Sequence, residues 1–236
     1  EIIANSVNMG FGTANNIGFE ASRTLFTLLL NPDTVVPTGA LEHLLATAKA
    51  YPDAAVIAPL LKNPDSALEL YLMGLGEKTH HRQEASPDGN LCTGFIMGAA
   101  MLWRMDAWQR LGGFDEAIFI YGEDTDIALR ATEAGYSLVV TPGAEIYHLG
   151  GQSDTPTRHT RWRKAWHMTY GHLYVKAKHG EEVAAREEAQ RLRRYHSLKA
   201  LLYLIVIRPR KMLDNLARAL AASAFLGGRP SWPGRQ

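Results

Sequence analysis

The segment Leu25-Phe26-Thr27-Leu28-Leu29-Leu30-Asn31-Pro32-Asp33 joins an unbroken apolar run to a turn. Such a run is typical of a strand buried on both faces, and proline cannot extend an inner strand, so the chain must leave the sheet there. Helical patterns at 10–23 and 38–50 flank this strand, and a second apolar strand follows at 54–61. This alternation predicts an α/β fold with a mostly parallel sheet and flanking helices.

Beyond residue 61 the pattern changes twice. Residues 62–91 are polar and interrupted by proline and glycine, as in a long functional connection. A flexible joint is expected at 150–154, with only helices after it. The expected elements are strands over 95–103, 137–140 and 144–148, a helix over 106–111, and C-terminal helices over about 158–178, 181–195 and 197–223.

The motif Tyr121-Gly122-Glu123-Asp124-Thr125-Asp126 places three carboxylates before a helical pattern that stops at Gly135. Acidic side chains favour the first turn of a helix, where unpaired amide donors and the helix dipole attract negative charge. One interpretation is therefore an acidic helix start with no further role. The other is a general base, Asp124 or Glu123, held at a cleft by the helix end.

Two further candidate sites lie at strand ends. Asn31-Pro32-Asp33 follows a buried strand, and ligands of open α/β sheets bind beyond the carboxyl ends of the strands. A carboxylate there can hold a divalent cation, although the same residues also form plain turns. His148 follows the apolar pair Ile146-Tyr147 and is either a metal or phosphate contact or a structural histidine.

The composition narrows the class of protein. The chain has 236 residues with 46% hydrophobic content, which suits one substantial core with an appendage. Its single cysteine, Cys92, excludes an internal disulfide and fits a reducing compartment. No secretory signal is visible, and the longest apolar run, Ala200 to Ile207, is far shorter than the ~20 residues of a spanning helix.

The formal net charge of +1 conceals an asymmetry between the two parts of the chain. Residues 1–157 carry 8 Lys and Arg against 19 Asp and Glu, whereas residues 158–236 carry 17 against 5. This division suggests an acidic, cation-binding body and a basic tail that meets an anionic surface. The alternative is two solvated faces that neutralise each other.

Taken together, the motifs form a recognisable order. Asn8 to Gly18 is a turn and helix rich in asparagine and glycine, and Asn31-Pro32-Asp33-Thr34 follows the strand. Thr93-Gly94-Phe95-Ile96-Met97-Gly98-Ala99-Ala100 then leads to Leu111-Gly112-Gly113-Phe114-Asp115-Glu116, before the acidic motif and His148. From about residue 5 to 153 this order resembles the family-2 glycosyltransferases, particularly the bacterial rhamnosyltransferase-like branch.

The resemblance implies a GT-A fold over residues 1–153, with residues 154–236 as a basic helical C-terminal extension. It also implies transfer of a sugar, with inversion, from a nucleotide-diphosphate donor. The family's metal motif is Asp-x-Asp, and here Asn31 replaces its first acid while Asp33 keeps the second. By the resemblance, Asp33 holds Mg²⁺ or Mn²⁺ and His148 is a further metal or phosphate contact. Asp124 looks like the catalytic base, with Glu123 as the other catalytic candidate. The residues expected to contact donor or acceptor are Asn15, Asn31, Gly98 and Asp126.

Members of this family begin with a strand and segments that grip the nucleotide, and none of these precedes Glu1. The expectation is therefore an N-terminally truncated transferase domain.

The C-terminal region carries two patterns. Trp162, Trp166, Tyr170 and Tyr174 are spaced four apart, as one stripe of a helix, which we expect to pack on the catalytic core. The apolar residues of 201–207 are bracketed by Lys199 and by basic residues at 208–211, which suits anionic lipid headgroups. Nucleic acid is a weaker explanation because no binding motif accompanies the charge. A cytoplasmic enzyme, peripheral on the inner face of the plasma membrane, is expected.

The leading hypothesis is an inverting, metal-dependent glycosyltransferase that acts on a bacterial cell-surface glycan or a polyprenyl-linked acceptor, with dTDP-rhamnose as the favoured donor. The alternative is a non-catalytic, truncated transferase domain that acts as a membrane- or partner-binding module. A metal-dependent phosphoryl hydrolase is a third hypothesis, disfavoured because it would call for a denser ligand cluster.

Overall fold

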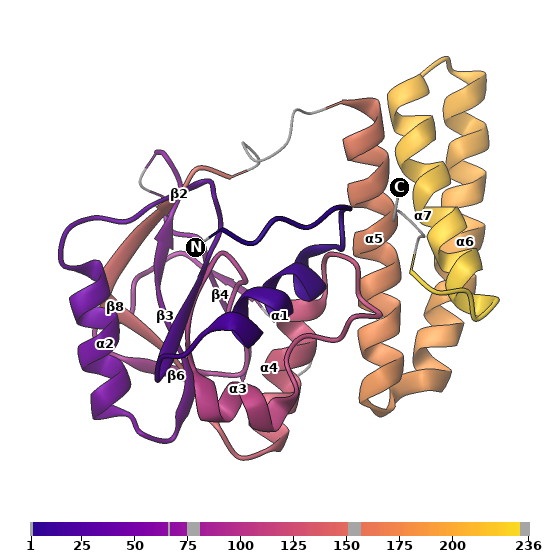
Figure 1. Cartoon of the computed structure of the whole chain (residues 1–236). Helices are drawn as coiled ribbons and strands as arrows, with labels where there is room; N and C mark the ends of the chain where they lie inside the picture. Colours follow the sequence, from indigo (N-terminus) through magenta and orange to yellow (C-terminus); the bar gives the residue numbers. More distant parts are fainter. Residues whose placement is uncertain (1, 66, 75–80, 151–156, 232–236) are drawn as a thin grey trace. The chain divides into compact units, whose positions relative to one another are not determined.

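The computed structural model describes residues 2–65, 67–74, 81–150 and 157–231 (Figure 1). The chain divides into two compact units, each built from separate stretches. One unit, called the helical unit below, consists of Glu1–Ala14, Asp115–Glu123 and Asp154–Gln236. The other, the sheet unit, consists of Asn15–Phe114 and Asp124–Ser153.

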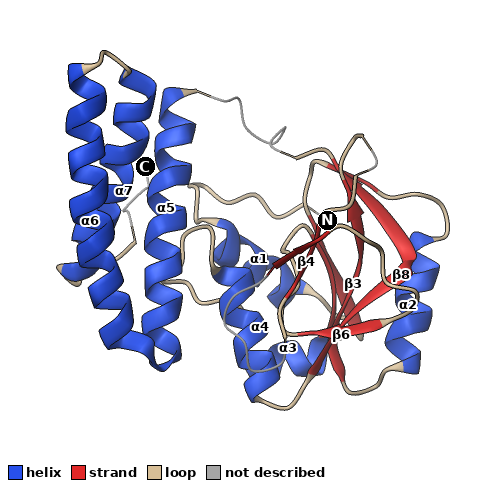
Figure 2. Ribbon diagram, turned by 180° about the vertical axis from the view of Figure 1, so that it is seen from behind, coloured by secondary structure: helices blue, strands red, loops and turns tan. Residues whose placement is uncertain are grey.

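The sheet unit is organised around a six-stranded sheet in the order β1-β7-β3-β8-β2, with β6 paired to β8 (Figure 2). A separate two-stranded sheet pairs β4 with β5. The strands are β1 Phe26–Leu30, β2 Thr34–Val35, β3 Ala54–Lys62, β4 Leu70–Leu72, β5 His81–Gln83, β6 Leu91–Thr93, β7 Ala100–Arg104 and β8 Ser137–His148.

The pairing of the strands corrects the expectation of a mostly parallel sheet. Among the described strands of this sheet, only β3 and β8 run parallel, whereas β1–β7, β3–β7, β2–β8 and β6–β8 are antiparallel. The reason is the connection between β3 and β7. A parallel pair needs a long crossover, usually helical, but the described residues between these two strands contain short strands and no helix.

Three predicted strands also differ in detail. The strand expected over 95–103 begins only at Ala100, and the two strands expected over 137–148 form one continuous β8 with a register shift opposite Pro59 and Leu60. Burial of the first strand on both faces is wrong, because only Leu29 of β1 is buried, Leu30 is exposed and the other three residues are half-buried. The expected joint at 150–154 lies outside the described residues from Gly151 onward.

Helices cover the sheet and close the core. They are α1 Phe11–Ala21, α2 Ala40–Ala50, α3 Met105–Leu111 and α4 Glu123–Glu133. The first eight residues of β3 are all buried, and Leu44 of α2 packs with Ile57 of β3 and Ile146 of β8 in one hydrophobic cluster. These contacts place α2 over the two central parallel strands.

The helical unit contains α5 Arg158–Lys176, a π-helical turn Ala177–Glu181, α6 Glu182–Ile205 and α7 Pro209–Leu226. The predicted break near residue 196 is wrong, since α6 continues to Ile205. Tyr195-His196-Ser197 contains no helix breaker, whereas Pro209 opens α7 at a first-turn position, where its missing N–H is not needed. No helix among the described residues is long and apolar enough to cross a membrane.

The aromatic stripe packs within the helical unit. Trp166 and Tyr170 form a buried cluster with Ala217 and Ala221 of α7, and their rings stack with centroids 5.1 Å apart. Trp162 and Tyr174 pack at the edge of this cluster. The main apolar partner of the stripe is therefore α7, whereas contact with residues 1–153, as we expected, is made by Tyr174, whose hydroxyl donates to Asp115 Oδ2 at 3.0 Å.

Candidate active site

Pairing of β2 with β8 brings Asp33 and His148 together. Thr34 lies opposite His148 in the register, so Asp33, one residue earlier, reaches the imidazole. The Asp33 Oδ1 atom lies 3.6 Å from His148 Nε2. The Asp33 carboxylate is buried, and its Oδ1 atom has no hydrogen-bond partner among the described residues. A buried carboxylate oxygen without a hydrogen bond is costly, unless a ligand completes its surroundings.

Glu69 is a member of this site that the sequence analysis missed. Its Oε2 atom lies 2.9 Å from His148 Nδ1. The backbone N–H of Glu69 donates to the carbonyl of Leu61 near the end of β3, which anchors the Glu69 main chain there. A carboxylate that accepts from Nδ1–H leaves the lone pair on Nε2, the atom that faces Asp33. Nothing in the sequence spacing marks Glu69, because it lies in the irregular segment after β3.

The Asp33–His148 pair fits a divalent cation. Carboxylate oxygen and imidazole nitrogen are accepted ligands, and the Asp33 Oδ1 atom, which has no hydrogen-bond partner among the described residues, lies 3.6 Å from His148 Nε2. Among the described residues, no group of three or more His, Cys, Asp or Glu side chains could enclose a metal. The site therefore fits a cation that takes its remaining ligands from water and substrate phosphates, as Mg²⁺ commonly does.

Asn31 and Gly98 belong to neighbouring turns of the sheet unit. Leu30 lies opposite Ala100 where β1 pairs with β7, and the Asn31 N–H donates to the Ala99 carbonyl at 2.9 Å. Gly98 lies two residues before Ala100, the residue that pairs with Leu30. The turn after β1 and the turn before β7 therefore lie at the same end of these two strands. Asn15 lies half-buried on α1.

The acidic motif forms the first turn of α4, as its composition predicted. Asp124 is half-buried, and its Oδ1 atom accepts a hydrogen bond from the Thr125 N–H at 2.8 Å. Glu123, the first residue of α4, is buried. Of the two candidate bases, Asp124 is therefore the more accessible, and it belongs to the same compact unit as Asp33 and His148.

Asp126 was expected to contact donor or acceptor, and its buried position corrects this prediction. Its side chain has 0% exposure and pairs with Arg130, with 2.9 Å between Oδ2 and the guanidinium. Arg130 in turn donates to the carbonyls of Leu111 and Gly113, each at 2.7 Å. This network joins α4 to the end of α3, and it leaves Asp126 no surface from which to touch a substrate.

A strained turn orients the start of α4. Tyr121 has φ of 67° and Gly122 has φ of 107°, so both residues occupy the left-handed half of conformational space. Gly171 of α5 lies against this turn, where an added methyl group would overlap the Tyr121 carbonyl oxygen. Residue 171 of α5 must therefore be glycine for the two backbones to approach this closely. Gly171 and the turn Tyr121-Gly122 form a single backbone contact.

A mixed sheet that gathers a carboxylate, an amide and an imidazole at its strand ends, followed by an acidic helix start, is the arrangement of a GT-A glycosyltransferase domain. The solved structure titled GalNAc-T7 with UDP, GalNAc and Mn²⁺ shares this fold. It matches 79% of this chain and 42% of that chain, with a TM-score of 0.52 and 16% sequence identity. This likeness confirms the predicted fold.

The chain belongs to glycosyltransferase-like family 2, whose family model matches residues 2–169. It is 28% identical over 177 residues to N-acetylglucosaminyl-diphospho-decaprenol L-rhamnosyltransferase of Mycobacterium tuberculosis, covering 62% of this chain and 58% of that protein. It is 30% identical over 156 residues to pre-mycofactocin glycosyltransferase of the same species, covering 63% of this chain and 32% of that protein. The chain thus spans less than two thirds of these relatives.

Proposed function

We propose that this chain belongs to an inverting, metal-dependent glycosyltransferase that takes its sugar from a nucleotide-diphosphate donor. The observation that carries the proposal is the pair Asp33–His148, with an unpaired buried oxygen facing an oriented imidazole at 3.6 Å. Family membership supplies the reaction class, and the similarity to an L-rhamnosyltransferase makes rhamnose the first donor sugar to test.

In the proposed reaction, Asp124 accepts the proton of the acceptor hydroxyl while that oxygen attacks the anomeric carbon. A sugar hydroxyl is a poor nucleophile, so a positioned carboxylate contributes as the bond forms. Asp33 and His148 would hold Mg²⁺ or Mn²⁺, which supplies positive charge to the leaving diphosphate. A single displacement from the opposite face inverts the anomeric centre and needs no covalent enzyme intermediate.

The proposed acceptor is a cell-surface glycan or a lipid-linked precursor. The name of the mycobacterial relative describes an acceptor joined to decaprenol through a diphosphate, which supports a lipid-linked acceptor here. We assign catalysis to residues 1–153 and a membrane-facing role, on the inner face of the plasma membrane, to residues 154–236. The basic composition of the second segment supports this division.

The test is donor hydrolysis and sugar transfer by a full-length form that contains this chain, in the presence of Mn²⁺. Release of nucleotide diphosphate with dTDP-rhamnose, lost in Asp124→Asn, would support transfer by this site. Unchanged release in Asp124→Asn would assign the base elsewhere. Failure to bind or turn over any nucleotide sugar would instead support the alternative of a non-catalytic binding module.

A further inference from the structure

The turn between α6 and α7 carries an apolar tip, composed of Leu204, Ile205, Val206 and Ile207. Their side chains are between 49% and 84% exposed, and Leu198, Leu201 and Leu202 extend the exposed apolar surface along α6. Scattered apolar residues are normal on a protein surface, but a contiguous group of this kind marks an interaction site.

The backbone of the tip is strained at Ile207, which shares a positive φ with only one other non-glycine residue among those described, Tyr121. The end of α6 has the two hydrogen bonds of a Schellman motif, Arg208 N–H to the Tyr203 carbonyl and Ile207 N–H to the Leu204 carbonyl. This motif places Ile207 at φ of 52°, a conformation that is unfavourable for a β-branched residue.

Two other helices in the described part of the chain end in the same motif, with glycine at the corresponding position. Gly135 follows α4 with φ of 85°, and Gly228 follows α7 with φ of 63°. Ile207 is the exception, and it is also 84% exposed. The Ile207 side chain is held in a strained turn although it does not pack inside the protein, which points to an interaction with another molecule.

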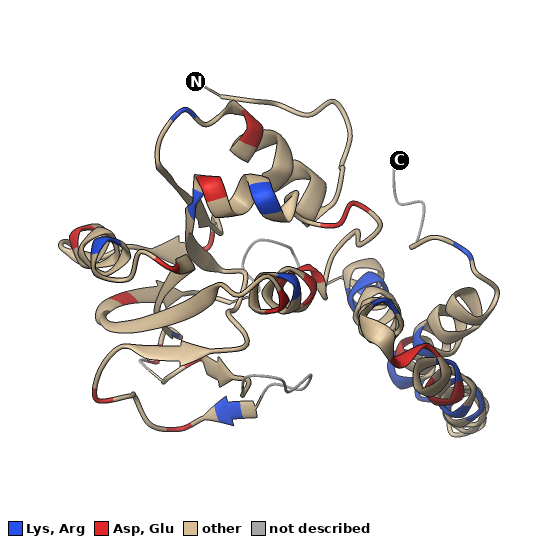
Figure 3. Ribbon diagram, turned by 90° about the horizontal axis from the view of Figure 1, so that it is seen from below, with Lys and Arg blue, Asp and Glu red and all other residues tan. Residues whose placement is uncertain are grey.

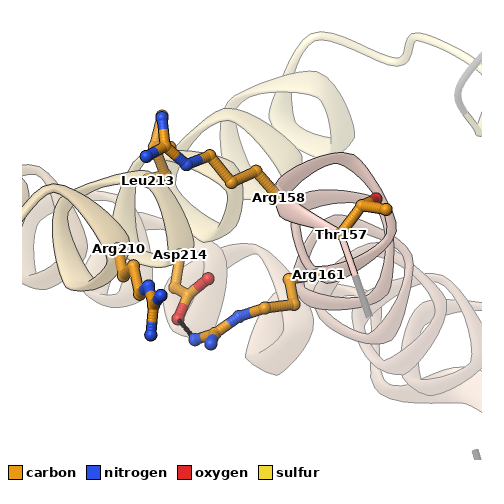
Figure 4. A pocket seen from close by; sticks show the side chains of 6 residues that line it. All are labelled: Thr157, Arg158, Arg161, Arg210, Leu213 and Asp214. Atoms are coloured by element: carbon orange, nitrogen blue, oxygen red, sulfur yellow. Dashed lines mark hydrogen bonds and ion pairs between the residues drawn. The ribbon is translucent and has the colours of Figure 1, made fainter. Parts of the chain in front are cut away.

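A pocket lined by arginines lies beside the tip. Its walls, called the arginine pocket here, are formed by Thr157, Arg158, Arg161, Arg210, Leu213 and Asp214 around a cavity of about 190 Å³ (Figure 4). Arg161 is paired with Asp214 at 2.7 Å. Arg158 and Arg210 form no ion pair with any described residue, so the pocket keeps an excess of positive charge.

The placement of the helices reinforces this charge. Arg158 begins α5 and Arg210 lies in the first turn of α7, so two helix N-termini point their positive dipole ends to the same end of the helical unit. Figures 1 and 2 show the start of α5 and the α6–α7 turn at that end of the helical unit. Guanidinium groups together with helix N-termini are suited to a phosphate group.

The surroundings of the tip match an anionic surface. Residues 189–213 carry seven Lys and Arg and no Asp or Glu. Figure 3 shows Lys and Arg along the helices of this unit. An apolar segment that is too short to span, flanked by basic side chains, is the pattern of a segment that lies in the headgroup region of a bilayer.

We propose that this end of the helical unit docks on an anionic phospholipid bilayer. The apolar tip enters the boundary between headgroups and acyl chains, and the arginine pocket receives the phosphate of one lipid headgroup. The inference deepens the proposed membrane location and rests on it, but it requires no sugar transfer. Vesicle binding without donor and donor hydrolysis without vesicles can therefore fail independently.

The first measurement is flotation of the full chain with vesicles of phosphatidylcholine, with and without phosphatidylglycerol. Binding should require the anionic lipid and weaken as salt rises, because basic residues near an anionic leaflet are screened within a Debye length. Equal binding to both vesicle types at every salt concentration would overturn the proposal. Inorganic phosphate at the same phosphate concentration should neither bind measurably nor compete, and strong binding of it would assign the pocket to a soluble phosphate instead.

The second measurement separates binding from folding. Ile207→Gly should raise the melting temperature, because glycine adopts the left-handed conformation without strain, and it should lower vesicle binding. The matched control is Val183→Ser, which removes an exposed apolar residue at the opposite end of α6 and should leave binding unchanged. Unchanged vesicle binding by Ile207→Gly would overturn the role of the tip.

The third measurement tests the pocket. The double variant Arg158→Glu/Arg210→Glu should lower binding at least about tenfold, since each basic residue near the leaflet contributes measurably. Both substitutions place an acid in the first turn of a helix, which favours folding. The control is Arg186→Glu, which changes the charge of one residue by the same amount about 30 Å from the tip along α6. It should change vesicle binding by less than about threefold.

The conservative double variant Arg158→Lys/Arg210→Lys distinguishes a phosphate site from general charge attraction. Lysine keeps the charge but loses the planar pair of donors, so binding should fall several-fold. Binding equal to that of the parent chain would overturn the pocket and leave only diffuse attraction. Self-association of the chain in place of vesicle binding would assign the apolar tip to a second copy and overturn the proposal.

Discussion

Asp33 and His148 lie far apart in the sequence, yet Asp33 Oδ1 and His148 Nε2 are only 3.6 Å apart where β2 pairs with β8. Both residues sit at strand ends, and Glu69 contacts the other ring nitrogen of His148, Nδ1. This relationship is the basis of the first two predictions.

Asp33→Ala and His148→Ala should each raise the Mn²⁺ concentration needed for half-maximal binding by at least about tenfold, because each removes one proposed ligand. Asn31→Asp should tighten binding by adding a second carboxylate to the turn. Calorimetric titration with Mn²⁺ measures these effects without the reaction. Glu145→Gln is the control, since its carboxylate lies on β8 but is paired with Lys62 at 2.6 Å. Full activity of the parent enzyme in chelator would contradict the metal assignment.

Glu69→Ala should weaken Mn²⁺ binding by about 10–100-fold, the usual effect of losing a residue that orients a ligating histidine. The ¹⁵N chemical shifts of the His148 ring should also change, since Nδ1–H would lose its acceptor. Glu69→Gln keeps an acceptor oxygen and should recover much of the affinity. If Glu69→Ala binds the metal like the parent chain, Glu69 does not position His148.

Asp124→Asn should reduce sugar transfer at least about 10²-fold, the lower range for loss of a general base, while leaving stability nearly unchanged. Asp126→Ala should instead lower the stability of the protein. It leaves Arg130 without its buried partner, so the free energy of unfolding should fall by about 3–5 kcal/mol. Chemical denaturation and kinetics on both variants separate the two roles. Transfer by Asp124→Asn within about threefold of the parent enzyme would exclude it as the base.

Gly171→Ala should destabilise the protein by about 1–3 kcal/mol, because the added methyl group would overlap the Tyr121 carbonyl oxygen. Gly18→Ala is the matched control, also a glycine inside a helix, but with open space around the added group. It should stabilise the protein by about 0.5–1 kcal/mol through helix propensity. Thermal melts of the two variants should therefore shift in opposite directions.

His167 should make stability depend on pH. Burial, with a smaller contribution from the charge of Arg163, lowers the pKa of His167 from 6.5 to about 4. The unfolded chain therefore binds a proton that the folded chain rejects, and stability should fall as the pH drops from about 6.5 to about 4, by up to about 3 kcal/mol.

The control for this effect is His167→Phe, which keeps a ring against Phe119. Denaturation of this variant should show a smaller decline over the same pH range. An identical decline in the parent chain and in His167→Phe would show that other groups cause the pH dependence.

Much of the fold could be predicted because its signals are local. The apolar run at β1, the helices α1 and α2, and the strand β3 lie close to where the pattern indicated. The direction of the strands could not be predicted in this way. Pairing of β7 between β1 and β3 depends on contacts between distant segments, which the apolar pattern of one strand does not specify. Likewise, no breaker at 195–197 was present to stop α6, and the aromatic stripe had several possible partners.

By itself, the sequence determined the class of the protein and the residue types at its strand ends, because turn chemistry, apolar periodicity and motif order are written in neighbouring residues. Only the tertiary structure decided that Glu69 orients His148 and that Asp126 is buried with Arg130. It also decided that Ile207 is held in a strained, exposed turn. These outcomes depend on register, burial and backbone conformation, which arise from the packing of segments that are distant in the chain.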